Sequence, residues 1–247
     1  MLKSQQINTL EFDKAVESMT EIAGIELGEY IHYRESIIKA LLLAINDPTK
    51  KENFIHNLFM KQWSESSNDK VYSSNFWLLD DRFMSFVHAW SDVKISSITN
   101  EKLKGYMFEK DGRRKPDVVL YFNKDEDSEF VDAIVVEFKG LNANHDQKTK
   151  ALTEINENVK ALRLYNKKIR NIYCYIITSI DEEMENTLNT MQGYVRRSVA
   201  GGERIYYCFN DKIDCHINVL DVESIASEAH DRNSTFLKIL TKNINHN

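Results

Sequence analysis

The chain has 247 residues, of which 42% are hydrophobic and 28% are charged, so it is long enough to bury a core and too apolar to be intrinsically disordered. Its net charge of −6 excludes a polybasic protein that coats nucleic acid, although an acidic enzyme that holds metal ions can still bind nucleic acid locally. Its three cysteines lack C-x-x-C spacing, and it shows neither a membrane-length apolar segment nor a hydrophobic leader, so we expect a cytoplasmic protein without disulfides, structural zinc or membrane contact.

The first hundred residues are predicted to be mainly helical. Apolar residues at helical spacing predict a helix from Leu27 to Ile45, which Asn46-Asp47-Pro48 ends. Farther along, we expect a helix over residues 52–63, a polar loop over residues 64–74 and a buried, aromatic-rich helix over residues 76–90. We therefore expect a helical N-terminal region (residues 1–74) followed by a core domain (residues 75–247).

The pattern then changes to one of strands and helices. The turn sequence Asp111-Gly112 predicts a hairpin of strands over residues 103–108 and 118–122, and the β-branched run Phe130–Phe138 predicts a strand buried on both faces. The remaining expected elements are, in order, a helix (146–165), a strand (172–177), a helix (181–191), a hairpin of two strands (205–209 and 213–219) and a helix (224–240). This order predicts an α/β fold with a mixed central sheet flanked by helices.

Charged residues stand at the ends of two neighbouring predicted strands. Asp117 opens one strand, and Glu137 and Lys139 close the next. Side chains alternate along a strand, so Glu137 and Lys139 face the same side, and a hairpin between the two strands brings Asp117 close to Glu137. Because a buried charge is costly unless it is paired or coordinated, two carboxylates beside one lysine predict a site for Mg²⁺. Two simpler interpretations stay open: a surface ion pair for the glutamate and the lysine, and a turn residue for Asp117.

The spacing of these residues resembles the motif of the PD-(D/E)xK nuclease superfamily. The match consists of Pro116-Asp117 and, farther along, Glu137-Phe138-Lys139, followed by a helix and an apolar strand. The resemblance implies a restriction-endonuclease-like fold. It also implies that Asp117 and Glu137 hold Mg²⁺, with Mn²⁺ as a substitute, and that Lys139 positions the attacking water or stabilises charge on the phosphate. A lysine beside a metal at a desolvated strand end is further expected to have a lowered pKa, which favours a role as a base.

A wider resemblance covers most of the chain from about Leu27 onward. The segments that carry it are Leu27–Ile45, Asn75–Phe83, Ser91-Asp92 and His230–Leu240. They are similar to the nuclease-like region that follows histidine-kinase/Hsp90-type ATPase modules in bacterial defence proteins. The resemblance implies a role in anti-phage defence with an ATPase or another defence subunit as partner, and it makes Asp80 and Asp81 candidates for further metal ligands. An N-cap role for Asp80 and a favourable helix-dipole interaction for Asp81 are the open alternatives.

The chain departs from the resembled family in the helix after the E-x-K strand. Relatives often carry a Gln and a Tyr in that helix, whereas this chain has Glu154 and Asn158 at the nearest positions. Whether the earlier Gln147 supplies the contact that this helix makes in relatives stays open, and the expected roles of Asp117, Glu137 and Lys139 are unaffected. The chain also lacks the glycine-rich phosphate-binding loop of an ATPase.

Basic residues surround the predicted turn directly before Pro116-Asp117. They are Lys110, Arg113, Arg114 and Lys115. Beside a metal site, such residues are expected to contact phosphates and to position nucleic acid without reading its sequence. A solvated hairpin tip is the alternative.

Taken together, these patterns predict a Mg²⁺-dependent endonuclease that hydrolyses phosphodiester bonds of DNA. Two alternatives stay open: a catalytically inactive nuclease-like module that binds a partner ATPase, and an RNase. Because cleavage of both strands of a duplex usually needs two active sites, a homodimer is compatible with this prediction.

Overall fold

A computed structural model of the chain describes residues 9–47, 49, 52–67, 72–98, 113–122, 130–197 and 204–244. The chain forms two compact units, one of residues Ala40–Ala229 and one of residues Met1–Lys39 together with His230–Asn247. These bounds are not those of the division after residue 74, which we drew from secondary-structure content and which stays a prediction. Within the described ranges, no helix is both long enough and apolar enough to cross a membrane.

The elements follow the expected alternation of helices and strands. The helices are α1 (Thr9–Ile45), α2 (Glu52–Phe59), α3 (Ile95–Ile98), α5 (His145–Tyr165), α6 (Glu182–Thr190) and α7 (Val222–Ile244), with the 3-10 helices η1 (Phe76–Leu78) and η2 (Asp81–Ser85). The strands are β1 (Glu65–Ser67), β2 (His88–Ser91), β3 (Val118–Phe122), β4 (Val131–Phe138), β5 (Ile169–Thr178), β6 (Val195–Arg197), β7 (Ile205–Asn210) and β8 (Cys215–Asp221).

The strands form one mixed sheet in the order β1-β2-β3-β4-β5-β8-β7-β6. Its two ends are antiparallel, whereas β4, β5 and β8 run parallel in the middle. Parallel neighbours need a crossover connection, which α5 supplies between β4 and β5. The expected α/β fold with a mixed central sheet is therefore confirmed.

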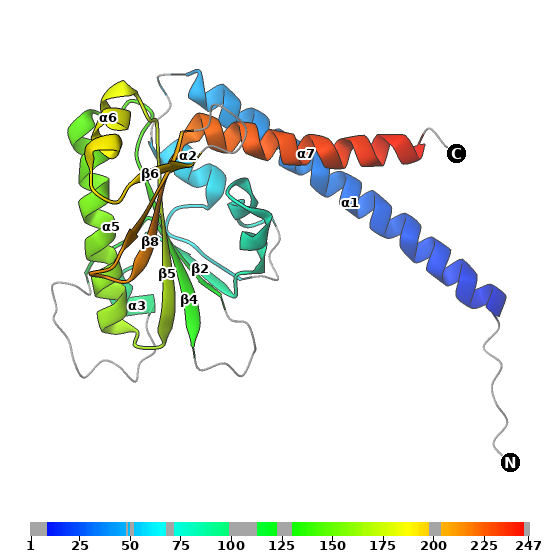
Figure 1. Cartoon of the computed structure of the whole chain (residues 1–247). Helices are drawn as coiled ribbons and strands as arrows, with labels where there is room; N and C mark the ends of the chain where they lie inside the picture. Colours follow the sequence, from blue (N-terminus) through cyan, green and yellow to red (C-terminus); the bar gives the residue numbers. More distant parts are fainter. Residues whose placement is uncertain are drawn as a thin grey trace, which may run out of the picture. The chain divides into compact units, whose positions relative to one another are not determined.

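Helix α5 covers one face of this sheet (Figure 1). The helix begins at a capping box, in which the Asn144 side chain accepts from the backbone N–H of Gln147 and the Gln147 side chain accepts from the backbone N–H of Asn144. Its apolar stripe includes Leu152, Ile155 and Val159, which are buried in one core cluster with alternate residues of the central strands. In this core, apolar residues at helical spacing on α5 thus pack against alternate residues of the strands.

Aromatic side chains cover the opposite face of the sheet. Phe138 at the end of β4 packs against Phe59 of α2, with ring centroids 5.1 Å apart. Phe83 of η2 packs edge-on against Tyr175 of β5 at 5.3 Å. Because these strand residues alternate with those that face α5, η2 and α2 lie on the other side of the sheet from α5.

The buried helix expected over residues 76–90 is wrong. These residues form η1, η2 and β2, and Asp80, with extended backbone, caps η2 by accepting a hydrogen bond from the backbone N–H of Arg82. Strand β2 pairs with β3, with Ala89 opposite Leu120. This pairing joins residues far apart in the sequence, so the local aromatic pattern carried no sign of it.

Three smaller differences concern element ends. The polar loop expected over residues 64–74 contains β1, which pairs with β2, and α2 ends at Phe59 instead of residue 63. Helix α1 begins at Thr9, well before Leu27. The expected strand over residues 103–108 and the Asp111-Gly112 turn lie outside the described residues, and the other expected elements are confirmed with small shifts at their ends.

We expect Phe138→Ala to lower the free energy of unfolding by about 3–5 kcal/mol, because it empties a fully buried site between two rings. The Phe138 ring contacts Phe59 and stacks on His56 with centroids 4.8 Å apart. Phe130→Ala, at a position that is 52% exposed, is expected to cost less than about 1 kcal/mol. Chemical denaturation of both variants measures the difference, and equal losses would contradict the packing described here.

The second unit pairs the N-terminal part of α1 with the C-terminal part of α7. The buried side-chain amide of Asn233 donates to the carbonyl oxygen of Ile31 (3.4 Å) and to Glu35 Oε2 (3.0 Å). The guanidinium of Arg34 lies 5.5 Å from the ring centroid of Phe236. A polar group satisfied inside a helix pair favours one register of the two helices.

Candidate functional site

The antiparallel pairing of β3 and β4 brings the two predicted carboxylates together. Val118 stands opposite Val136, so Asp117 and Glu137 are the next facing positions. Asp117 Oδ2 accepts a hydrogen bond of 2.7 Å from the backbone N–H of Phe138. Adjacent strands of one hairpin therefore place the pair, as the sequence predicted.

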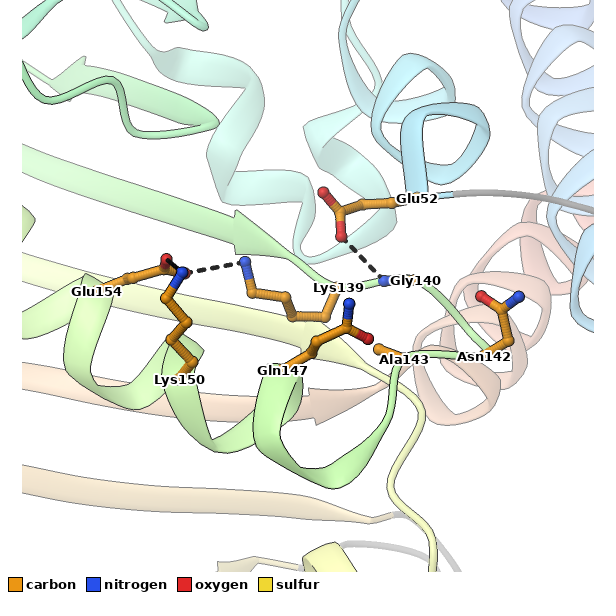
Figure 2. Close-up of a pocket in the computed structure, with 8 residues that line it drawn as sticks. All are labelled: Glu52, Lys139, Gly140, Asn142, Ala143, Gln147, Lys150 and Glu154. Atoms are coloured by element: carbon orange, nitrogen blue, oxygen red, sulfur yellow. Dashed lines mark hydrogen bonds and ion pairs between the residues drawn. The ribbon is translucent and has the colours of Figure 1, made fainter.

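Lys139 lies between two carboxylates. Its Nζ donates to Glu137 Oε1 at 2.9 Å and lies 3.0 Å from Glu154 Oε2 on α5. The side chains of Lys139 and Glu137 are only 14% and 8% exposed, respectively. Figure 2 shows Lys139 reaching toward Glu154, which also pairs with the exposed Lys150 one helical turn earlier (3.1 Å). The lysine is thus held by a strand and a helix at once.

A cleft of about 260 Å³ opens beside this lysine, where β4 ends and α5 begins. Figure 2 shows Glu52 at the start of α2 on its other side, where Glu52 Oε2 accepts from the backbone N–H of Gly140 at 3.1 Å. The wall of this cleft is mostly polar. It consists of Glu52, Lys139, Gly140, Asn142, Ala143, Gln147, Lys150 and Glu154.

Burial raises the pKa of both paired carboxyl groups. Desolvation raises the pKa of Asp117 to about 7, although the Phe138 N–H and the charge of Lys139 oppose the shift. Desolvation raises the pKa of Glu137 to about 8, and the negative charge of Asp117 adds to the shift. Two buried carboxylates beside one lysine are short of positive charge, so a bound cation stabilises their ionised forms.

The pKa of Lys139 is raised in the metal-free chain, and the lowering expected beside a bound metal stays a prediction. Burial alone lowers it, but the charges and hydrogen bonds of Glu137 and Glu154 outweigh the desolvation. The expected lowering assumed a bound metal and a desolvated strand end, and it did not include the carboxylate of Glu154 on α5. Lys139 is consequently a permanent cation at neutral pH and is suited to stabilise negative charge.

Sequence reasoning missed two acidic neighbours of Asp117. The charges of Glu52 and Asp92 both raise the pKa of Asp117. The backbone N–H of Asp92 donates to the carbonyl oxygen of Asp117 at 2.9 Å, and Asp92 has a positive φ of 55°. The only signal in the sequence was the Ser91-Asp92 segment of the wider resemblance, to which no role was given.

The neutral His56 completes the surroundings of Asp92. Its Nε2 lies 2.8 Å from Ser91 Oγ, and its Nδ1 lies 4.0 Å from Asp92 Oδ2. Burial lowers the pKa of His56 to about 4, so the imidazole is uncharged at neutral pH. It therefore supports the β2 end by packing and hydrogen bonding, and it does not add positive charge to the site.

The structure places Asp80 and Asp81 with a different part of the fold. Both belong to the start of η2, which packs on the sheet face opposite α5, and the carboxylate of Asp80 forms a 2.7 Å ion pair with Arg82. Glu137 alternates with residues of that face and so points toward α5. The N-cap interpretation of Asp80 is confirmed, and the role of Asp80 and Asp81 as metal ligands stays a prediction.

The predicted basic residues differ in their surroundings. Arg114 pairs with Glu157 of α5 at 2.6 Å. Burial raises the pKa of Asp92, and the charge of the nearby Lys115 opposes that shift. Arg113 is exposed, and Lys110 lies outside the described residues. Arg114 and Lys115 are thus held near the β3 end, where their role as phosphate contacts stays a prediction.

The donor set fits a magnesium ion with few protein ligands. Within the described ranges, no group of three or more His, Cys, Asp or Glu side chains is arranged to hold a metal ion. Mg²⁺ usually keeps several waters and takes only one or two carboxylates from the protein. The two oxygen donors of Asp117 and Glu137, both short of positive charge, match that requirement.

No family model, no curated protein and no solved structure matches this chain.

We expect Glu154→Gln to reduce any metal-dependent cleavage by about 10- to 100-fold, because Lys139 loses one of the two carboxylates that hold its Nζ. Steady-state cleavage of a labelled oligonucleotide measures the loss. The matched control is Glu182→Gln, an exposed glutamate at the start of α6. Equal activity of both variants and the wild type would show that α5 does not position the lysine.

Proposed function

We propose that this chain is a divalent-metal-dependent nuclease that hydrolyses phosphodiester bonds of DNA. The observation that carries the proposal is the buried arrangement of Asp117, Glu137 and Lys139 at the ends of β3 and β4. Two carboxylates that can hold a metal ion, beside one fixed cation that lines a cleft, are a donor set suited to phosphoryl hydrolysis. We also propose that the sheet with α5 is restriction-endonuclease-like, which the order β3-β4-β5 and the α5 crossover support.

In this proposal Asp117 and Glu137 would hold the metal ion. When bound, Mg²⁺ supplies Lewis-acid stabilisation of the phosphate and activation of water. Because their pKa values are raised, Asp117 and Glu137 would give up protons near neutral pH when they hold the ion.

The chain's own residues orient the reacting groups. Lys139 is charged and nearly buried, so its Nζ can donate to a water or to a phosphate oxygen without the cost of reorganising solvent. Glu154 and Glu137 fix the position of that Nζ. The hydrogen bond from the Phe138 N–H fixes one oxygen of Asp117.

The direct test incubates the purified chain with supercoiled plasmid, linear duplex DNA and RNA in Mg²⁺, in Mn²⁺ and in EDTA. The proposal expects DNA cleavage that requires metal and is lost in EDTA. Cleavage of RNA alone would identify an RNase. Absence of cleavage with all substrates and both metals would favour the inactive module for a partner ATPase.

A further inference from the structure

Aromatic rings form a continuous row on the sheet face opposite α5, across β5, β8 and β7. The row consists of Tyr173, His216, Phe209 and Tyr207, with Arg197 of β6 at its end. These residues alternate along their strands with the buried core residues that face α5. The row therefore belongs to a different surface from the cleft at Lys139.

The rings lie at stacking distances. Tyr173 and His216 are nearly parallel, with centroids 4.9 Å apart and planes at 13°. His216 also contacts Phe209 at 5.0 Å, and its Nδ1 lies 2.8 Å from the hydroxyl oxygen of Tyr207. Because each ring is fixed by its neighbour, little conformational entropy is lost when a flat ligand stacks on the row.

The row is both exposed and positively charged at one end. Phe209 is 47% exposed, and the other three rings of the row are half-buried. The guanidinium of Arg197 lies 3.8 Å from the ring centroid of Tyr207, and within the described part of the chain no carboxylate pairs with it. A stacked arginine that pairs with no carboxylate among the described residues suits a polyanion with planar groups better than it suits an apolar protein surface.

A cavity of about 640 Å³ adjoins the other end of the row at Tyr173. Phe83, Phe122 and Tyr175 contribute further rings to its wall. The wall also contains Arg82, which is paired with Asp80, and Asp132, which is paired with Arg170. The cavity is thus large enough for a flat heterocycle and offers aromatic faces to it.

We propose that this face, from the cavity through the aromatic row to Arg197, binds single-stranded nucleic acid by stacking its bases. Exposed aromatic residues on a sheet with an arginine at the edge provide base-stacking platforms that tolerate any sequence. A duplex hides its bases, so it is excluded from such stacking. The inference goes beyond the proposed nuclease function, because binding on this face requires neither metal nor cleavage.

The test measures fluorescence anisotropy of a labelled oligothymidylate of about 20 nucleotides with the full chain in EDTA, where metal-dependent cleavage cannot occur. Tyr173→Ala and Phe209→Ala are each expected to weaken binding about tenfold. Tyr173→Phe and Phe209→Tyr keep the ring and are expected to retain binding within about threefold. Trp63→Ala removes a 76%-exposed ring next to β1 at the opposite edge of the sheet and is the matched control.

Each outcome decides the proposal. The proposal is supported if the chain binds the single strand at least about tenfold more tightly than the corresponding duplex, and if only the two alanine variants of the row lose this binding. Wild-type protein that does not bind the oligonucleotide, or alanine variants that bind as the Trp63→Ala control does, would overturn it. A dimer that dissociates on Phe209→Ala while oligonucleotide binding stays unchanged would overturn it too, because a second copy would then occupy the face. A chain that binds in EDTA but never cleaves would leave this inference standing and refute only the nuclease function.

Discussion

Lys139→Met is expected to reduce cleavage by about 100- to 1,000-fold while the chain stays folded. The methionine keeps the length of the buried side chain, but it removes the cation that lies 2.9 Å from Glu137 and 3.0 Å from Glu154. Negative charge that develops on the phosphate then lacks its fixed counter-charge. Single-turnover cleavage at saturating metal measures the loss, and Lys160→Met, at an exposed position of α5, is the matched control.

The raised pKa of Lys139 distinguishes two roles for this lysine, that of a fixed cation and that of a general base. Glu137 and Glu154 raise the pKa of Lys139, so this lysine stays protonated throughout the neutral range. We therefore expect that deprotonation of Lys139 does not change the cleavage rate at alkaline pH. Lys139→Arg, which keeps a charge at every accessible pH, is then expected to retain more activity than Lys139→Met. If the arginine and methionine variants were equally inactive and the wild-type rate followed deprotonation of a lysine, Lys139 would be a base instead.

Glu137→Gln is expected to abolish metal binding and cleavage, and yet to stabilise the metal-free fold at alkaline pH by about 1–3 kcal/mol. Burial raises the pKa of Glu137 from its ordinary value of 4.5 to about 8 and the pKa of Asp117 from 3.8 to about 7. Between these values the native chain holds protons that the unfolded chain has lost. The free energy of unfolding of the wild type therefore falls as pH rises through this window.

The glutamine does not titrate, so the variant escapes this loss. Thermal denaturation in EDTA at pH 5 and at pH 9 measures this loss of stability. The wild type is expected to be less stable at pH 9 than at pH 5, and Glu137→Gln is expected to show a smaller difference. Mg²⁺ is expected to stabilise the wild type at pH 9 and to leave the variant unchanged. A glutamine variant that is destabilised at pH 9, or that is stabilised by Mg²⁺ like the wild type, would contradict the assignment. Glu223→Gln, an exposed glutamate of α7, controls for the substitution itself.

The part of the candidate site that was predictable is the part that neighbouring strands build. Asp117, Glu137 and Lys139 lie on two strands of one hairpin, and strand alternation together with hairpin pairing determines which side chains meet. The long apolar runs of β4 and β5 and the helical spacing of α5 are equally local signals, so these elements and the mixed sheet were predictable.

Tertiary structure alone decided which residues surround Asp117 and Glu137, and which rings meet on the sheet face opposite α5. Glu52, Asp92 and Glu154 reach the site from three separate elements, and Glu154 adds to Glu137 in raising the pKa of Lys139 in the metal-free chain. Pairing of β2 with β3 replaced a helix that local pattern favoured, and β8 lies between β5 and β7, which aligns rings distant in the sequence into one row. The physical reason is common to all of these cases: alternation and periodicity act between neighbours along the chain, whereas burial, charge and ring stacking depend on which segments the fold brings side by side.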